Sequence, residues 1–212
     1  MIPATIQYHY APHNYKPWAL NSHFIYTPLG LPHATLQALQ SSLRNPKSKT
    51  ETTVGGPAAR KVFKSIRDVQ ALTLNPELVT HISDLIHKST ELLIGLKLKP
   101  CGSFGFYQYE SPHGHYDWHC DSGHVRNGVL QHNYPCRQVS IIYYPNTDYV
   151  GGELELAYSN SGNSDDRISL IKIKPAVDHI LIFPSDIRYP HRVYPVTKGT
   201  RFAIVNWFEI VN

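Results

Sequence analysis

Four residues from three separate parts of the chain could together hold a metal ion and an acid. His119 and Asp121 stand two positions apart in a His-Cys-Asp triplet, and His191 and Arg201 follow much later. Two histidines and one carboxylate are the facial ligand set that binds non-heme Fe(II) and leaves coordination positions open. A guanidinium can donate two parallel hydrogen bonds to a carboxylate. The pattern therefore predicts O2 chemistry at Fe(II), with 2-oxoglutarate as the acidic co-substrate.

A strand would place two of the expected ligands together. Alternate residues of a strand share a face, so His119 and Asp121 are expected on one side and Cys120 on the other. Strands that are remote in sequence, such as the one expected at His191, lie close together in a jelly roll. Each residue alone is weak support, because the chain has 13 histidines and short motifs often match by chance. Their combined spacing favours a metal site.

The length and composition indicate one large domain with a sizeable core. The chain has 212 residues, and no stretch approaches the length of a membrane-spanning helix. The first twenty residues lack the basic start and apolar run of a secretory signal. The three cysteines, Cys101, Cys120 and Cys136, have no zinc-like spacing. Free thiols in a reducing, cytoplasmic setting, with no membrane partner, are the simplest interpretation.

The formal charge of +4 is unevenly distributed along the chain. Residues 1–67 hold eight basic residues and one acid, whereas residues 68–212 hold twelve basic residues and fifteen acids. A basic N-terminal third could face an acidic partner. The basic residues form no block of five or six like charges, so a solvated surface is the favoured interpretation.

Two helices are expected in the first half of the chain. Residues 31–44 carry leucines at helical spacing, and Pro32 suits a first helical turn. Residues 76–94 show the stronger pattern, because Asn75 is a good N-cap and Pro76 suits the first helical position. The leucines of this second segment are all expected to pack against a sheet.

The rest of the chain divides into one polar loop and a series of strands. Residues 45–57 are rich in turn formers, so a long loop that could act as a lid is expected. The predicted strands are residues 103–109, 138–144, 153–156, 168–173, 179–183, 191–194 and 202–208. This order predicts a single, mainly β domain with a double-stranded β-helix, or jelly roll. Residues 1–101 would supply helical support and the lid loop, and residues 102–212 the catalytic core.

The residues of this predicted core resemble a known enzyme family. The matching runs are YDWHCD at 116–121, RQVSIIYY at 137–144, GGELEL at 151–156, ILIFPSD at 180–186, PHRV at 190–193 and PVTKGTR at 195–201. In order and spacing, residues 103–209 resemble the catalytic core of Fe(II)/2-oxoglutarate-dependent dioxygenases of the prolyl 4-hydroxylase-like branch. The segment at 122–136 looks like an insertion, and the first hundred residues carry no part of the resemblance.

The resemblance implies a role for each of the four residues that could hold a metal ion and an acid. His119, Asp121 and His191 match the iron ligands, and Arg201 matches the residue that pairs with the distal carboxylate of 2-oxoglutarate. Halogenating relatives lack the carboxylate that Asp121 supplies, so its presence favours hydroxylation. The implied reaction converts 2-oxoglutarate and O2 to succinate and CO2 while an unactivated C–H bond is hydroxylated. Ascorbate is an optional further reductant.

Aromatic residues are expected around these ligands. By the same resemblance, Tyr109 and Tyr144 match tyrosines of the co-substrate pocket, and Trp207 matches a position in its wall. Tyr116 stands three residues before His119 and is expected on the substrate side. Without the resemblance, these residues would be interpreted as ordinary strand aromatics.

The resemblance leaves the substrate open. One hypothesis is a prolyl residue in a peptide or protein, with residues 45–57 folded over an extended substrate. A second is a free amino acid or small metabolite with the same mechanism. Nucleic-acid demethylation is disfavoured, because that branch carries a second arginine six residues beyond the position of Arg201, where this chain has Trp207. A non-catalytic β-barrel binding module is disfavoured by the complete ligand set, and the oligomeric state is not indicated.

Overall fold

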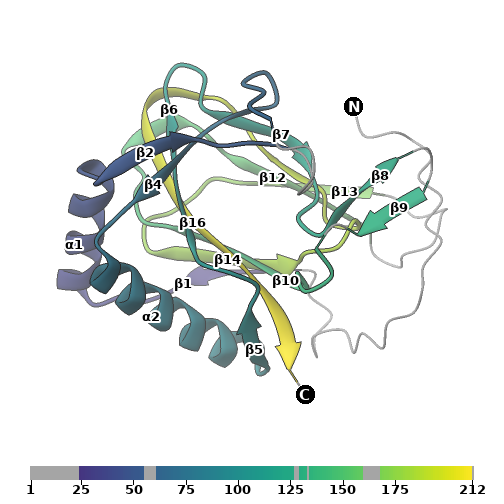
Figure 1. Cartoon of the computed structure of the whole chain (residues 1–212), viewed down its shortest axis with the longest axis horizontal. Coiled ribbons are helices and arrows are strands. Elements are labelled where there is room, and N and C mark those ends of the chain that lie inside the picture. The colour runs from purple at the N-terminus through teal and green to yellow at the C-terminus, as the bar shows by residue number, and fades with distance from the viewer. Residues whose placement is uncertain (1–23, 55–60, 127–128, 133, 160–167, 212) are drawn as a thin grey trace.

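The computed structural model describes residues 24–54, 61–126, 129–132, 134–159 and 168–211. They form three layers, in which two helices cover one face of a large antiparallel sheet and a smaller sheet packs against its other face (Figure 1). Two buried clusters of side chains join these layers. The cavity that contains the candidate site residues is lined by strands of both sheets.

The large sheet supplies one wall of the molecule. Its main path runs β1-β14-β10-β16-β6-β4-β2, and β5 and β11 also pair with β16. The strands are β1 (Ile25–Pro28), β2 (Ser48–Glu51), β4 (Gln70–Thr73), β5 (Lys97–Pro100), β6 (Gly105–Glu110), β10 (Val139–Tyr144), β11 (Tyr149–Gly151), β14 (His179–Pro184) and β16 (Val196–Val211). Because β16 pairs with β6, β10, β5 and β11, it is the central element of the sheet.

The smaller sheet faces the site from the other side. Its order is β13-β12-β15-β7-β3. The strands are β3 (Arg67–Asp68), β7 (His115–His119), β12 (Leu154–Ser159), β13 (Ile168–Ile173) and β15 (His191–Val193). A separate hairpin, β8 (Gly123–Arg126) and β9 (Val129–His132), occupies most of the insertion-like segment at 122–136. Two packed antiparallel sheets of this kind confirm the expected mainly β jelly roll.

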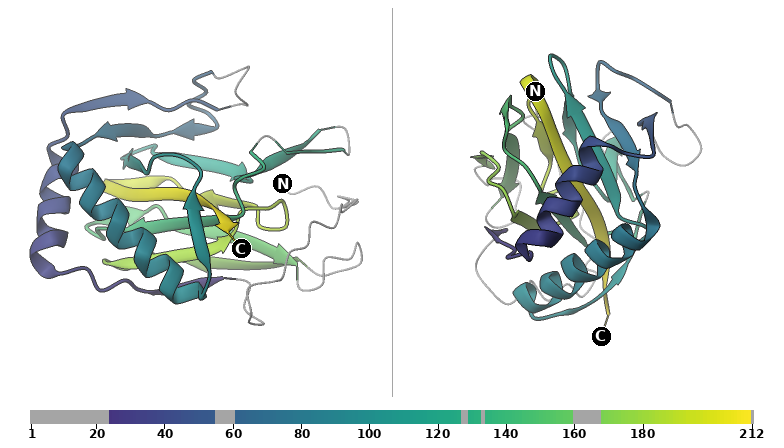
Figure 2. Two further views of the ribbon diagram at one scale, coloured as in Figure 1. Left: turned by 60° about the horizontal axis from the view of Figure 1, so that its bottom comes forward. Right: turned by 90° about the vertical axis from the view of Figure 1, so that its left-hand side faces the viewer.

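The helices α1 (His33–Arg44) and α2 (Pro76–Ile94) lie together against the large sheet (Figure 2). The prediction for α2 is confirmed: the Asn75 side chain accepts a hydrogen bond from the backbone N–H of Glu77, and the helix ends at Gly95 in a left-handed conformation. Ile82 and Ile86 are fully buried against the sheet. No described helix combines the length and apolar character needed to cross a membrane.

Two sequence-based expectations need correction. The leucines of α2 do not all pack, because Leu92 is 84% exposed and Leu93 is 37% exposed. Leu92 falls outside the stripe that Ile82 and Ile86 turn toward the sheet, because six residues separate it from Ile86. Leu93 stands two turns after Ile86 and shares its face, but it lies in the last turn of the helix, next to its end at Ile94.

The proposed loop at 45–57 is also wrong in part. Residues 48–51 form β2, which pairs with β4 from Ser48↔Thr73 to Glu51↔Gln70. The polar composition hid this strand, because a fully exposed edge strand shows no apolar alternation. Residues 45–47 and 52–54 lie outside the named helices and strands, apart from a single bridge between Val54 and Lys61, and residues 55–57 lie outside the described part of the chain.

Candidate metal centre and its pocket

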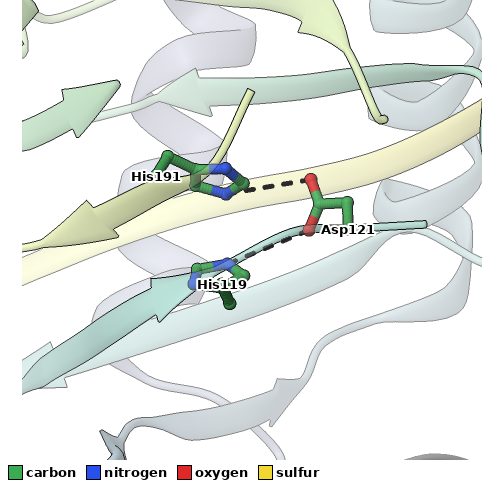
Figure 3. Close-up of side chains that lie close together, drawn as sticks. All are labelled: His119, Asp121 and His191. Atoms are coloured by element: carbon green, nitrogen blue, oxygen red, sulfur yellow. Dashed lines mark ion pairs between the residues drawn. The ribbon is translucent and has the colours of Figure 1, made fainter. Parts of the chain in front are cut away.

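Pairing between β7 and β15 brings the two candidate histidine ligands together. In the register of this pair, His119 stands directly opposite His191. The strand β7 ends at His119, so Asp121 follows the strand and does not lie on it as the alternation argument assumed. Figure 3 shows the Asp121 carboxylate turned toward both imidazoles. The backbone turn after β7, and not strand alternation, thus completes the cluster.

The three side chains offer their ligand atoms to one point. The Nε2 atom of His119 lies 3.9 Å from one carboxylate oxygen of Asp121, and the Nε2 atom of His191 lies 3.8 Å from the other. The candidate ligand atoms of all three residues lie within 4.8 Å of one another. They are therefore close enough to share a single ion, and two nitrogens with one carboxylate oxygen suit Fe(II).

Backbone carbonyl groups orient both imidazole rings in the same way. The Nδ1 atom of His119 lies 2.8 Å from the carbonyl oxygen of Asp117, and that of His191 lies 3.2 Å from the carbonyl oxygen of Tyr189. A proton on Nδ1 that is donated to this oxygen leaves the lone pair on Nε2 free for a metal. The Tyr116 ring stacks on His119 with ring centroids 3.5 Å apart, which fixes that imidazole further.

The electrostatics of the cluster favour the protonation states that a metal requires. Burial and the neighbouring His191 hold the pKa of His119 well below its ordinary value, so its imidazole is neutral. Burial acts to raise the pKa of Asp121, but the two imidazoles and a hydrogen bond outweigh burial, and the pKa is lowered. That hydrogen bond comes from the buried hydroxyl of Ser140, at 2.7 Å. Neutral histidines and an ionised carboxylate are the metal-binding forms.

Arg201 is fully buried, and its three guanidinium nitrogens have no hydrogen-bond partner among the described residues. Two of the expected pocket tyrosines surround it: the Tyr109 ring centroid lies 4.5 Å from its Cζ atom, and that of Tyr144 lies 5.3 Å away. A buried cation without a partner is costly unless an anion joins it. The distal carboxylate of 2-oxoglutarate fits this requirement in charge and in planar geometry.

A cavity of about 660 Å³ connects the histidine cluster to Arg201. Its wall includes Tyr109, Trp207 and Tyr116, all of which the sequence placed near the site. Toward the edge strand β2, the lining continues through Thr53 and Val54. A volume of this size suits a small co-substrate together with one residue of a substrate.

Two further arginines, Arg67 and Arg137, line this cavity. Arg137 begins the matching run at 137–144, but the sequence predicts no role in the site for either residue. The guanidinium of Arg67 lies 4.5 Å from the Tyr116 ring and 5.1 Å from the Tyr107 ring. Arg137 lies 3.6 Å from the Trp207 ring and donates a hydrogen bond of 2.9 Å to the backbone oxygen of Asp121. These stacked cations face the space beside the cluster, where a substrate has to enter.

The sequence of this chain is similar to those of known oxygenases and hydroxylases. The family model of the 2OG-Fe(II) oxygenase superfamily matches residues 104–209, which is half of the chain. A PKHD-type hydroxylase of Gloeothece citriformis is 25% identical over 151 residues, covering 70% of this chain and 61% of that protein. Human prolyl 3-hydroxylase 2 is 34% identical over 77 residues, covering 36% of this chain and 10% of that protein. The chain thus spans less than two thirds of the length of these relatives.

Solved structures share the fold. A Trichoplax adhaerens prolyl hydroxylase, in complex with a peptide fragment of the hypoxia-inducible factor oxygen degradation domain, superimposes with a TM-score of 0.66 and 21% identity. The match covers 88% of this chain and 83% of that chain. A Pseudomonas putida prolyl 4-hydroxylase superimposes with a TM-score of 0.57 and 20% identity, covering 88% of this chain and 92% of that chain.

Proposed function

This chain belongs to the 2OG-Fe(II) oxygenase superfamily, and from that premise we propose that it hydroxylates a prolyl residue in a peptide or protein. Its metal is Fe(II), its co-substrate is 2-oxoglutarate and its oxidant is O2. The proposal rests on one observation above all. A single cavity joins the cluster of His119, Asp121 and His191 to the buried guanidinium of Arg201, which has no hydrogen-bond partner among the residues that the structure describes.

Each residue of the site has a defined task in the proposed reaction. His119, Asp121 and His191 would hold the metal, and Arg201 would anchor the distal carboxylate of 2-oxoglutarate. When bound, Fe(II) couples decarboxylation of 2-oxoglutarate, to succinate and CO2, with insertion of one oxygen atom into a C–H bond. The aromatic wall excludes water, which strengthens the contact between Arg201 and the carboxylate.

A peptide substrate is supported by the lining of the cavity. The cavity reaches the segment that follows the exposed edge strand β2, where Thr53 and Val54 form its wall. Arg67 and Arg137 add donors in the same space, and both can meet backbone carbonyl groups of an extended chain. The Trichoplax relative was solved with such a peptide.

The proposal is tested by incubating the protein with Fe(II), 2-oxoglutarate, ascorbate and pools of proline-containing peptides. We expect succinate to form in step with the gain of one oxygen atom on proline, located by fragment mass spectrometry. Oxygen gain on free amino acids alone would favour the second hypothesis, a metabolite hydroxylase. That alternative has no observation of its own in its favour.

Replacing Gly152 by alanine should weaken 2-oxoglutarate binding more than it weakens the fold. A Cβ atom at Gly152 would lie 2.9 Å from Cδ of Arg201 and 3.0 Å from Cγ2 of Val196, so the guanidinium has to shift. Calorimetric titration should show a Kd at least tenfold higher, because misplacement of a contact group by about 1 Å costs up to a hundredfold.

Gly95 provides the matched control for this substitution. Its φ of +69° is close to the +68° of Gly152, but nothing lies within 4 Å of the position of its Cβ atom. Both alanine variants should lose about 1–2 kcal/mol of unfolding free energy through left-handed backbone strain. If the two variants bind 2-oxoglutarate equally well, the contact between Gly152 and Arg201 has no role in co-substrate binding.

A further inference from the structure

A third tyrosine lies beside Arg201 that neither the motif nor the resemblance predicted. The hydroxyl oxygen of Tyr149 is buried and has no hydrogen-bond partner among the described residues, and the same is true of the hydroxyl oxygen of Tyr144. Burial raises the pKa of Tyr149, while the charge of the neighbouring Arg201 and its approach to the hydroxyl group act in the opposite direction. That approach does not meet the geometry of a hydrogen bond, so the hydroxyl group remains unpaired among the described residues. Buried hydroxyl groups are almost always hydrogen-bonded, so two that lack a partner beside a cation require an explanation.

The fold holds Tyr149 in this position through two glycines. Tyr149 stands on β11 opposite Gly199 of β16, at a register where a Cβ atom on Gly199 would lie 2.8 Å from the backbone oxygen of Asp148. A Cβ atom on Gly152 would lie 3.2 Å from the Tyr149 ring and 2.9 Å from Arg201. The absence of side chains at both glycines therefore allows the Tyr149 ring to lie close to the guanidinium.

The unpaired hydrogen-bond donors around Arg201 are as many as one carboxylate can accept. An ionised carboxylate has two oxygens with about four acceptor sites and no proton to donate. Arg201 can donate two parallel hydrogen bonds to it. The hydroxyl groups of Tyr144 and Tyr149 can supply the other two, which would satisfy every acceptor site of the carboxylate and both orphaned hydroxyl groups.

We propose that Tyr149 is a positioning residue that donates a hydrogen bond to the distal carboxylate of 2-oxoglutarate, together with Arg201 and Tyr144. This inference rests on the proposed function, because it needs 2-oxoglutarate in the cavity. It makes β11 part of the co-substrate site. It also makes Tyr149 a determinant of specificity for keto acids that carry a second carboxylate.

The test compares two ligands that differ only at the distal end. Equilibrium binding of 2-oxoglutarate and of 2-oxovalerate, which carries a methyl group in place of the distal carboxylate, is measured by calorimetry with redox-inert Mn(II). In Tyr149→Phe, the Kd of 2-oxoglutarate should rise about tenfold, as expected for loss of one hydrogen bond to a charged group. The Kd of 2-oxovalerate should stay within about twofold of the wild-type value, because that ligand offers Tyr149 no acceptor.

Tyr143→Phe is the matched control. Tyr143 neighbours Tyr144 in sequence but faces the helix side of β10, and its hydroxyl group donates a hydrogen bond of 2.9 Å to Asp178. Its loss should lower the unfolding free energy without changing either Kd. Tyr149→Phe removes a hydroxyl group that has no hydrogen-bond partner in the described part of the chain, so the ligand-free variant should be at least as stable as the wild type.

The outcomes separate this inference from the proposed function. If the wild type binds no 2-oxoglutarate, both fail. If the wild type binds 2-oxoglutarate and Tyr149→Phe binds it equally well, only the role of Tyr149 is refuted. An equal loss of affinity for both ligands would also refute it, since that result indicates altered packing and not a contact with the carboxylate. Loss restricted to 2-oxoglutarate supports it.

Discussion

Replacing Arg201 by methionine should strongly weaken 2-oxoglutarate binding while it makes the ligand-free protein more stable. The guanidinium is fully buried without a hydrogen-bond partner among the described residues. An unpaired buried charge destabilises a fold, so methionine, which fills similar space, should raise the unfolding free energy by about 1 kcal/mol or more. Truncating one partner of a buried charge pair costs about 2–5 kcal/mol, so the Kd of 2-oxoglutarate should rise roughly 30-fold or more.

Thermal denaturation with and without 2-oxoglutarate measures both effects at once. The wild type should gain stability as ligand is added, because ligand binds only the folded state. Arg201→Met should unfold at a higher temperature without ligand and gain much less stability than the wild type at the same concentration of 2-oxoglutarate. Arg44→Met is the control, since Arg44 is an exposed cation paired with Asp148 at 3.1 Å, and its loss should change little. A ligand-dependent gain in Arg201→Met equal to that of the wild type would remove Arg201 from the co-substrate site.

Replacing Asp121 by alanine should eliminate turnover and weaken metal binding. Asp121 supplies the sole carboxylate of the described cluster, and its two oxygens face the two imidazoles at 3.8 and 3.9 Å. Replacing a residue that only orients a metal ligand lowers metal affinity or activity by about 10–100-fold. Loss of a ligand itself should therefore exceed a hundredfold, both in succinate formation and in the Kd of Fe(II) or Co(II).

Metal titration followed by the visible spectrum of Co(II) gives a measure of this effect that does not depend on activity. Asp84→Ala is the control, because Asp84 is exposed on α2, which lies across the large sheet from the cavity. That variant should match the wild type in both assays. Metal affinity and turnover that survive unchanged in Asp121→Ala would mean that this carboxylate is not a ligand.

The comparisons confirm the resemblance that the sequence shows to prolyl 4-hydroxylase-like oxygenases. Features that depend on neighbours in the chain were predictable. The helix at 76–94 was predicted at its observed bounds, because its N-cap at Asn75 and its end before Gly95 are local signals. The strands β10, β13 and β14 were predicted within one residue at each end, because β-branched and aromatic runs bounded by turns are local signals too.

Features that depend on distant partners were not predictable. The polar segment 48–51 becomes a strand only because β4 lies beside it. Arg67 belongs to no motif, and Arg137 begins the matching run at 137–144 without a predicted role in the site. Both line the cavity because their segments lie beside the His119 cluster. Tyr149 carried no signal either, since nothing in its local sequence indicates that β11 pairs with β16 next to Arg201.

The sequence by itself determined the chemistry of this protein, because ligand type and charge belong to single side chains: two imidazoles, one carboxylate and one guanidinium. Only the tertiary structure decided that they meet, because the β7–β15 pairing sets His119 opposite His191 and the turn after β7 brings Asp121 to both. It also decided that the Arg201 guanidinium has no hydrogen-bond partner among the described residues, since burial between the two sheets removes the water that would otherwise satisfy it.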